Sequence, residues 1–139
     1  MPVVSYDYEL PYSYGPTGDR FPRLTLRIAN PSAQGLSVDA DAYLDSGAQR
    51  SLFDGGIGRA IGIDLLTGSQ QEYESTTGSR ITGMLHRIHL EHSDLGTFNL
   101  EVGFSTVRVT RNLLGRDFFN LIQIGFRERH LALYVTARP

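Results

Sequence analysis

Apolar residues recur at every second position along much of this chain of 139 residues. Leu24, Leu26 and Ile28 alternate with polar neighbours, and the same period returns at residues 38–44, 84–90, 98–104, 107–109 and 131–135. Alternation with a period of two is typical of strands that bury one face. The pattern therefore predicts a mostly β, antiparallel fold.

Two segments interrupt the alternation and are expected to form short helices. Residues 54–61 contain several glycines, which disfavour a long helix, and residues 117–121 follow an apolar run. The length favours a single domain over residues 1–139. Its first twenty or so residues carry four tyrosines among prolines and glycines. We expect them to form an arm or an edge segment.

Composition excludes several classes of function. A net charge of -2 gives no electrostatic reason to expect a nucleic-acid partner or an acidic membrane. The chain has no cysteine, which rules out disulfides, a thiol nucleophile and cysteine-ligated zinc. No apolar run approaches the ~18 residues of a membrane span, and the first residues lack the pattern of a signal peptide. We expect a soluble, cytoplasmic protein.

A single aspartate stands at the end of the alternating run at residues 38–44. With its successors it reads Asp45-Ser46-Gly47-Ala48, which places a carboxylate in a turn that glycine permits. A catalytic carboxylate needs such a position at the end of a half-buried strand. Asp-Ser-Gly is also ordinary turn chemistry. The alternative is therefore a solvated turn aspartate that caps its own loop.

A second segment, NLLGRD at residues 112–117, brings two apolar residues and a glycine. Glycine lets a strand pack closely against a loop because it carries no Cβ. Together with the Asp45 turn, this segment resembles the retropepsins, the single-domain aspartic proteases of retroviral type. The resemblance covers about residues 24–135. The pair DSGAQ and LLG-x-D is most similar to the cellular DNA-damage-inducible-type retropepsin domains and their bacterial relatives.

The resemblance implies a closed, β-barrel-like acid protease fold and an aspartic endopeptidase without cofactor or metal. Two carboxyl groups that share one proton can activate water and protonate the leaving amine. Only one Asp-Ser-Gly occurs, Asp-Thr-Gly does not, and no internal repeat is visible. The second carboxylate must then be Asp45 of another copy. The resemblance thus implies a homodimer that acts on a peptide or protein substrate.

The same resemblance assigns roles to the residues around Asp45. Ser46 would hydrogen-bond across the dimer, Gly47 would expose its backbone to the substrate, and Ala48 would keep the cleft floor narrow. The downstream segment would support the loop from beneath through Leu113, Leu114 and Gly115. Gly115 can also be interpreted as a plain strand end.

One difference from the viral pattern concerns the charged pair behind the loop. Retroviral enzymes carry an acid after the D-T/S-G-A tetrad, and it pairs with the arginine of their G-R segment. Here Gln49 and Arg50 follow the tetrad, so Arg116 lacks that partner. The hypothesis is that Asp117 pairs with Arg50, which preserves the contact with the charges exchanged.

Residues 73–83 lie where retropepsins place the flap, a hairpin that closes over the substrate and excludes water. The candidate flap and substrate-binding residues in this stretch are Tyr73, Thr77, Gly78 and Ile81. Thr-Gly-Ser is also generic hairpin chemistry. The choice of individual flap residues therefore stays open.

Other chemistries have weaker support. His86, His89 and His92 would share a helix face, but on a strand His89 points away from the other two, so we expect no metal site. The chain contains neither G-x-G-x-x-G nor G-x-S-x-G. The main rival is a non-proteolytic retropepsin-like module that binds an extended peptide or only dimerises. The intact Asp45 turn favours the enzyme, because a binding module gains nothing from like-charge repulsion.

Overall fold

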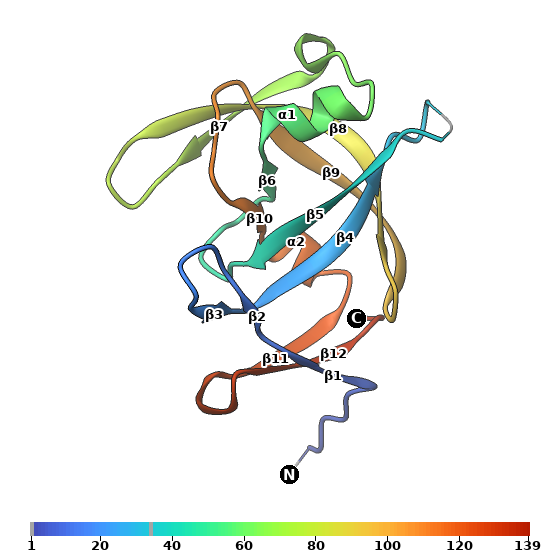
Figure 1. Ribbon diagram of the computed structural model, residues 1–139, viewed down its shortest axis with the longest axis vertical. Helices are drawn as coiled ribbons and strands as arrows, with labels where there is room; N and C mark the ends of the chain where they lie inside the picture. The colour runs from blue at the N-terminus through green and yellow to red at the C-terminus, as the bar shows by residue number, and fades with distance from the viewer. Residues whose placement is uncertain (1, 34) are drawn as a thin grey trace.

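The computed structural model describes residues 2–33 and 35–139 and shows a mostly β fold with two short α-helices, as predicted (Figure 1). The strands are β1 (Tyr8–Pro11), β2 (Ser13–Tyr14), β3 (Arg20–Phe21), β4 (Arg23–Ala29), β5 (Ser37–Leu44), β6 (Leu52–Phe53), β7 (Ser69–Glu74), β8 (Arg80–His92), β9 (Gly96–Ser105), β10 (Asn112–Leu114), β11 (Gln123–Arg127) and β12 (Ala132–Thr136). The helices are α1 (Gly55–Ala60), α2 (Arg116–Phe119) and the 3-10 turns η1 (Leu65–Thr67) and η2 (Glu128–His130).

The largest sheet has the strand order β4-β5-β10-β6-β9-β8-β7. β4 pairs with β8 as well as with β5, so the sheet closes on itself. β7 pairs with β8 and forms a hairpin that extends away from this ring of strands (Figure 1). Closure leaves the strands of the ring with few free edges.

Two strand pairings are parallel, whereas the sequence pattern predicts an antiparallel fold. β10 runs parallel to β5, and β6 runs parallel to β9. Alternation reports which face of a sheet a residue occupies, but it does not report the direction of the neighbouring strand. The pairing of β10 with β5 matters most, because it places two distant segments side by side at the candidate site.

The alternating strands bury one apolar face, as the sequence predicts. In β4, Leu24, Leu26 and Ile28 are at most 2% exposed, whereas Thr25 and Arg27 face the solvent. Each such side chain contributes about 1.5–3 kcal/mol when it is fully buried. The core also contains large side chains from later elements, namely Phe53, Ile88, Leu90, Val102, Phe104, Leu114 and Phe118.

The N-terminal segment contributes to two smaller sheets. β1 pairs with β12 at one edge of the sheet β1-β12-β11. The hairpin of β2 and β3 forms a sheet of its own. Its Phe21 packs against Tyr43 of β5, with ring centroids 5.5 Å apart. This segment therefore reaches the strand that leads to Asp45.

One predicted strand, at residues 107–109, is wrong. Val107 is exposed, and the amide of Val109 donates to Asp54 Oδ1 at 2.9 Å. Asp54 Oδ2 accepts the amide of Gly56 at 3.1 Å and caps the start of α1. The segment is held by a side chain instead of a neighbouring strand, and two valines were too short a pattern to decide.

Both α-helices lie where the sequence predicted helices. α1 falls inside residues 54–61. α2 begins one residue before the predicted 117–121, because the Gly115 carbonyl accepts the amides of Phe118 and Phe119. Within the described ranges, no helix is long and apolar enough to cross a membrane.

Candidate active site

Asp45 follows the last residue of β5 and starts a tight turn. Its amide donates to the Leu114 carbonyl at 2.9 Å, and its carbonyl accepts the amide of Ala48 at 3.1 Å. Its carboxylate oxygen Oδ1 accepts the amide of Gly47 at 2.8 Å. Ser46 and Gly47 are exposed at the surface of the turn. The strand end and the turn thus fix the backbone of Asp45 and leave its second carboxylate oxygen, Oδ2, without a protein hydrogen bond in the described chain.

β10 supports this turn from the neighbouring position in the sheet. Leu113 lies opposite Tyr43, and Leu114 lies opposite Leu44. Leu114 is fully buried, and Leu44 is also in the core. Leu113 lies on the other face of β10 and is only half-buried. The two leucines therefore occupy opposite faces, Leu114 in the core and Leu113 on the face that it shares with Tyr43.

Gly115 lies where the segment after β10 packs closely against the backbone of residues 48–50. A Cβ on Gly115 would lie 2.6 Å from the Ala48 carbonyl oxygen and 3.0 Å from the carbonyl carbon of Arg50. The amide of Arg116 donates to that Ala48 carbonyl at 2.8 Å. A side chain at position 115 would force the two segments apart. The close approach, instead of a plain strand end, explains the glycine.

The predicted pair of Asp117 with Arg50 is not formed. Asp117 instead receives both hydrogen-bond donors of Ser51, with the amide at 3.0 Å from Oδ2 and the hydroxyl at 2.7 Å from Oδ1. Ser51 Oγ in turn accepts the amide of Gly115 at 3.0 Å. Ion pairs among the described residues are Arg23–Asp41 and Arg27–Asp39. A fully buried serine therefore takes the place that the sequence suggested for an arginine.

Sequence reasoning missed Ser51, although one signal was present. Ser51 immediately precedes the apolar Leu52 and Phe53, which are buried. A hydroxyl that enters the core needs a hydrogen-bond partner. Asp117 is the one acid in the segment at residues 112–117, so a pair of Ser51 with Asp117 is an alternative that the two motifs together suggest.

The hairpin of β7 and β8 carries the candidate flap residues. Its turn is closed by hydrogen bonds from the Ser75 amide to the Ser79 carbonyl at 2.9 Å and from the Gly78 amide to the Ser75 carbonyl at 3.0 Å. Gly78 has a φ of 84°, a conformation that favours glycine. Thr77 lies beside it in the exposed turn. Ile81 lies opposite Tyr73, in the pair that follows Glu74 and Arg80 away from the turn.

Tyr73 is the penultimate residue of β7, close to the turn of this hairpin, and its side chain points back toward the ring of strands. Its hydroxyl donates to the Ser51 carbonyl at 3.1 Å. Its side chain covers Gly83 and Gly103, where an added Cβ would come within 2.6 Å of the ring and 2.3 Å of the hydroxyl oxygen, respectively. Burial is the main cause that raises the pKa of Tyr73 to about 12. Tyr73 therefore connects the hairpin to the loop that follows the Asp45 turn.

A cluster of cations and aromatic rings surrounds Tyr43, and no sequence motif predicts it. The guanidinium of Arg23 lies 5.4 Å from the Tyr43 ring centroid, and that of Arg111 lies 4.6 Å from it. Arg111 also lies 5.1 Å from the Phe21 ring centroid. These partners are far apart in the sequence, so no local spacing predicts their contact.

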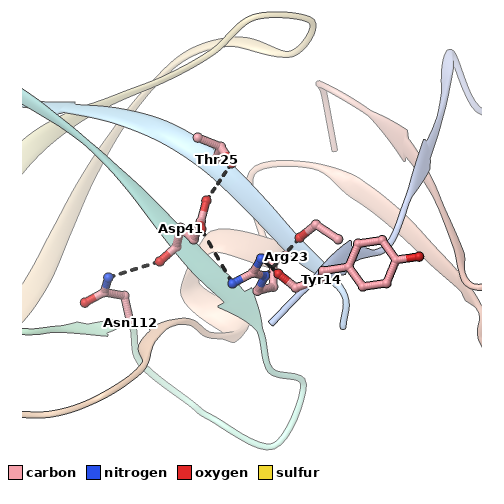
Figure 2. A network of polar contacts seen from close by, with 6 residues as sticks. Tyr14, Arg23, Thr25, Asp41 and Asn112 are labelled. Carbon is pink, nitrogen blue, oxygen red and sulfur yellow. Dashed lines mark hydrogen bonds and ion pairs between the residues drawn. The ribbon is translucent and has the colours of Figure 1, made fainter. Parts of the chain in front are cut away.

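Figure 2 shows the polar contacts that hold Arg23. Arg23 pairs with Asp41 at 3.5 Å and donates to the hydroxyl of Ser13 at 2.9 Å and to the carbonyl of Tyr14. Asp41 Oδ1 also accepts the Thr25 hydroxyl at 2.6 Å. The network fixes the β2–β3 hairpin against β4 and β5.

The histidines of β8 have separate partners. His86 contacts the Leu65 carbonyl, and His89 contacts the side chain of Asn99. His92 Nδ1 accepts the amides of Asp94 and Leu95. In the described ranges, no three histidine or acidic side chains are grouped to hold a metal ion.

The sequence matches no protein-family model and no curated protein. Among solved structures, the chain is similar to a retropepsin-like aspartic protease from Rickettsia conorii, with a TM-score of 0.63 and 13% identity over 100% of both chains. It is also similar to the EIAV protease in complex with the inhibitor HBY-793. In that comparison the TM-score is 0.53 and the identity 13%, over 73% of this chain and 86% of the other. The chain therefore has a retropepsin-like fold.

Proposed function

We propose that this protein is an aspartic endopeptidase that acts as a homodimer, with one Asp45 from each subunit in a shared active site. The observation that carries the proposal is the position of Asp45. Its carboxylate ends β5 in a turn that Leu114 and Gly115 hold at backbone level, and Oδ2 is not engaged by the described protein. The likeness of the fold to structures of aspartic proteases supports this interpretation.

The chemistry requires two carboxyl groups that share one proton. The ionised carboxylate takes a proton from a water molecule, whose oxygen attacks the carbonyl carbon of the peptide bond. The protonated carboxyl donates to the carbonyl oxygen, and the tetrahedral intermediate then breaks its C–N bond as the leaving amine gains a proton. One chain supplies one Asp-Ser-Gly turn. The second carboxyl is therefore assigned to the partner subunit's Asp45.

The other predicted residues take supporting roles in this proposal. The exposed backbone at Ser46 and Gly47 is available to a partner subunit and to the substrate. The β7–β8 hairpin would cover an extended peptide and exclude water, with Thr77 and Gly78 at its exposed turn. Ser51 and Asp117 would keep the segment behind the turn rigid.

Replacement of Asp45 by asparagine tests the proposal. D45N keeps the size of the side chain and the acceptor for the Gly47 amide, but it removes the group that must ionise. We expect hydrolysis of a complex peptide mixture by the wild-type protein and none by D45N, with unchanged circular dichroism. D64N is the matched control, because Asp64 is exposed and its side chain caps no helix. Turnover by pure D45N would contradict the proposal.

A further inference from the structure

Arg111 directly precedes β10 and Asp45 directly follows β5, and the alternation of these two parallel strands assigns both residues to the same face. Side chains two residues apart on a strand share a face, so Tyr43 shares that of Asp45. Leu113 lies opposite Tyr43 across the parallel pair β5–β10, and Arg111 precedes Leu113 by two residues. The intervening Leu44 is in the core. Arg111, Leu113, Tyr43 and Asp45 therefore form a row on the face of these strands opposite to Leu44 and Leu114.

Two aromatic rings fix the guanidinium of Arg111 in this row. It lies 4.6 Å from the ring centroid of Tyr43 and 5.1 Å from that of Phe21. Aromatic faces attract a guanidinium through its plane, and this leaves its N–H edges available for hydrogen bonds. Phe21 reaches this place from the β2–β3 hairpin, which the contacts of Arg23 hold in position. The guanidinium is thus positioned before any ligand binds.

The two arginines beside Tyr43 differ in their charge environment. Arg23 is neutralised by Asp41 at 3.5 Å and also bonds to Ser13. Arg111 is exposed, and within the described residues it takes part in no ion pair and no side-chain hydrogen bond. A guanidinium carries five N–H donors and suits a carboxylate in bidentate geometry. Arg111 is therefore a positioned cation whose matching anion does not come from its own neighbourhood.

We propose that Arg111 determines substrate specificity by binding the carboxylate of an aspartate or glutamate side chain close to the scissile bond. The proposal rests on the proposed protease function. A strand rises about 3.3 Å per residue, so the ring of Tyr43 is rooted about 6.6 Å before Asp45 along β5. Same-side residues of an extended peptide repeat at about that distance. The acidic side chain would lie within about three residues of the cleaved bond.

Positional profiling of a peptide mixture tests this role. Peptides made from a whole proteome with a different protease would be digested by the wild-type protein, R111E, R111K and R59E, and the new ends sequenced by mass spectrometry. R59E is the matched charge reversal, because Arg59 is exposed on α1, away from the Asp45 turn (Figure 1). The same mixture would be applied to immobilised D45N to record which peptides bind without cleavage.

We expect one position near the cleaved bond to prefer Asp and Glu over Asn and Gln about tenfold, the effect of one charge-assisted hydrogen bond. R111E should reverse the preference toward Lys and Arg, R111K should weaken it but keep its sign, and R59E should leave it unchanged. A merely structural Arg111 would move melting temperatures and not the preference. If R111E does not fold, two other measurements test the role of Arg111. They are the weakened acidic preference of R111K and the loss of the wild-type preference at raised salt.

Cleavage without an acidic preference, or with one that R111E retains, would overturn the role of Arg111 while the protease proposal stands. Absence of any cleavage by the wild-type protein would instead contradict the protease proposal. The D45N capture then decides about Arg111 alone. Enrichment of acidic peptides that the double variant D45N/R111E loses would support binding by Arg111, and equal capture by both would refute it.

Discussion

Ser51 and Asp117, which are 66 residues apart, are joined by two hydrogen bonds at 2.7 and 3.0 Å. The pair connects the segment behind the Asp45 turn to the start of α2. Ser51 also accepts the Gly115 amide at 3.0 Å, so one buried hydroxyl serves both segments. The candidate active site is therefore held from behind by a serine and a carboxylate that hydrogen-bond to each other.

S51A should destabilise the protein. The substitution removes a donor to Asp117 and leaves the buried Gly115 amide without its acceptor. Unsatisfied buried groups cost about 1–3 kcal/mol each, so we expect the free energy of unfolding to fall by about 2 kcal/mol. Urea unfolding measures it. S37A, at an exposed serine of β5, is the control, and an S51A effect no larger than that of S37A would disprove the role of this pair.

G115A should be more destabilising than an alanine at a glycine that has open space around it. The added Cβ would lie 2.6 Å from a backbone oxygen of Ala48, which cannot move as a flexible side chain can. G96A is the comparison, because Gly96 has a φ of 87° and open space around it. Its cost is the left-handed backbone alone, about 1–2 kcal/mol. Thermal unfolding should rank G115A below G96A, and the reverse order would contradict the close approach.

Y73F should weaken the attachment of the β7–β8 hairpin while it keeps the ring in place. The lost hydroxyl donates to the Ser51 carbonyl at 3.1 Å. One such bond is worth about 1 kcal/mol, and the raised pKa of about 12 keeps the phenol protonated throughout neutral pH. We expect faster amide hydrogen exchange in β7 and lower stability. Y8F, at an exposed tyrosine, should change neither, and equal exchange in Y73F and wild type would rule out the attachment.

Acid should destabilise the protein through His92. Its Nδ1 accepts the amides of Asp94 and Leu95, which requires an unprotonated nitrogen. Burial is the main cause that lowers the pKa of His92 below its ordinary value of 6.5. The unfolded chain therefore binds the proton more readily. The stability from neutral His92 is complete above pH 6.5 and is lost as the pH falls from 6.5 through the lowered value.

H92Q should flatten the stability profile in that window. Chemical unfolding of wild-type protein and H92Q at closely spaced pH values below 7 measures the difference. H89Q is the control, because His89 lies on the same strand and makes an exposed contact with Asn99. A wild-type profile with the same slope as H92Q would show that His92 does not couple to folding.

The sequence was sufficient for the parts of this fold that depend on local pattern. The spacing of Leu24 and Leu26 predicts a half-buried strand, and both side chains are buried. The glycine in NLLGRD predicts a close approach of two backbone segments, which is found at Gly115. The two motifs also predict the retropepsin-like fold, which the similarity to solved structures confirms. Faces, turns and close approaches are properties of a few neighbouring residues, so the sequence states them directly.

Side-chain contacts between segments that are distant in the sequence could not be predicted from the sequence. Asp117 was paired with Arg50 by charge alone, but the buried Ser51 is its partner because burial favours a satisfied hydroxyl over a solvated guanidinium. The contact of the Arg111 guanidinium with the Phe21 ring depends on where the β2–β3 hairpin packs. No pattern in the sequence predicts that packing. The alternation at residues 107–109 predicted a strand wrongly, because two valines with strand-like spacing do not show that a neighbouring strand is available for pairing.

The central claim, one active site built from two chains, is tested most directly by mixing wild-type protein with D45A. Subunit exchange would first be shown with a fluorescent label. With random exchange at equal amounts, about a quarter of all dimers carry two intact Asp45 residues, by mass action. Activity per wild-type chain should then fall to about half and approach zero as D45A is added in excess. Activity per wild-type chain that stays constant at every ratio would contradict the shared site.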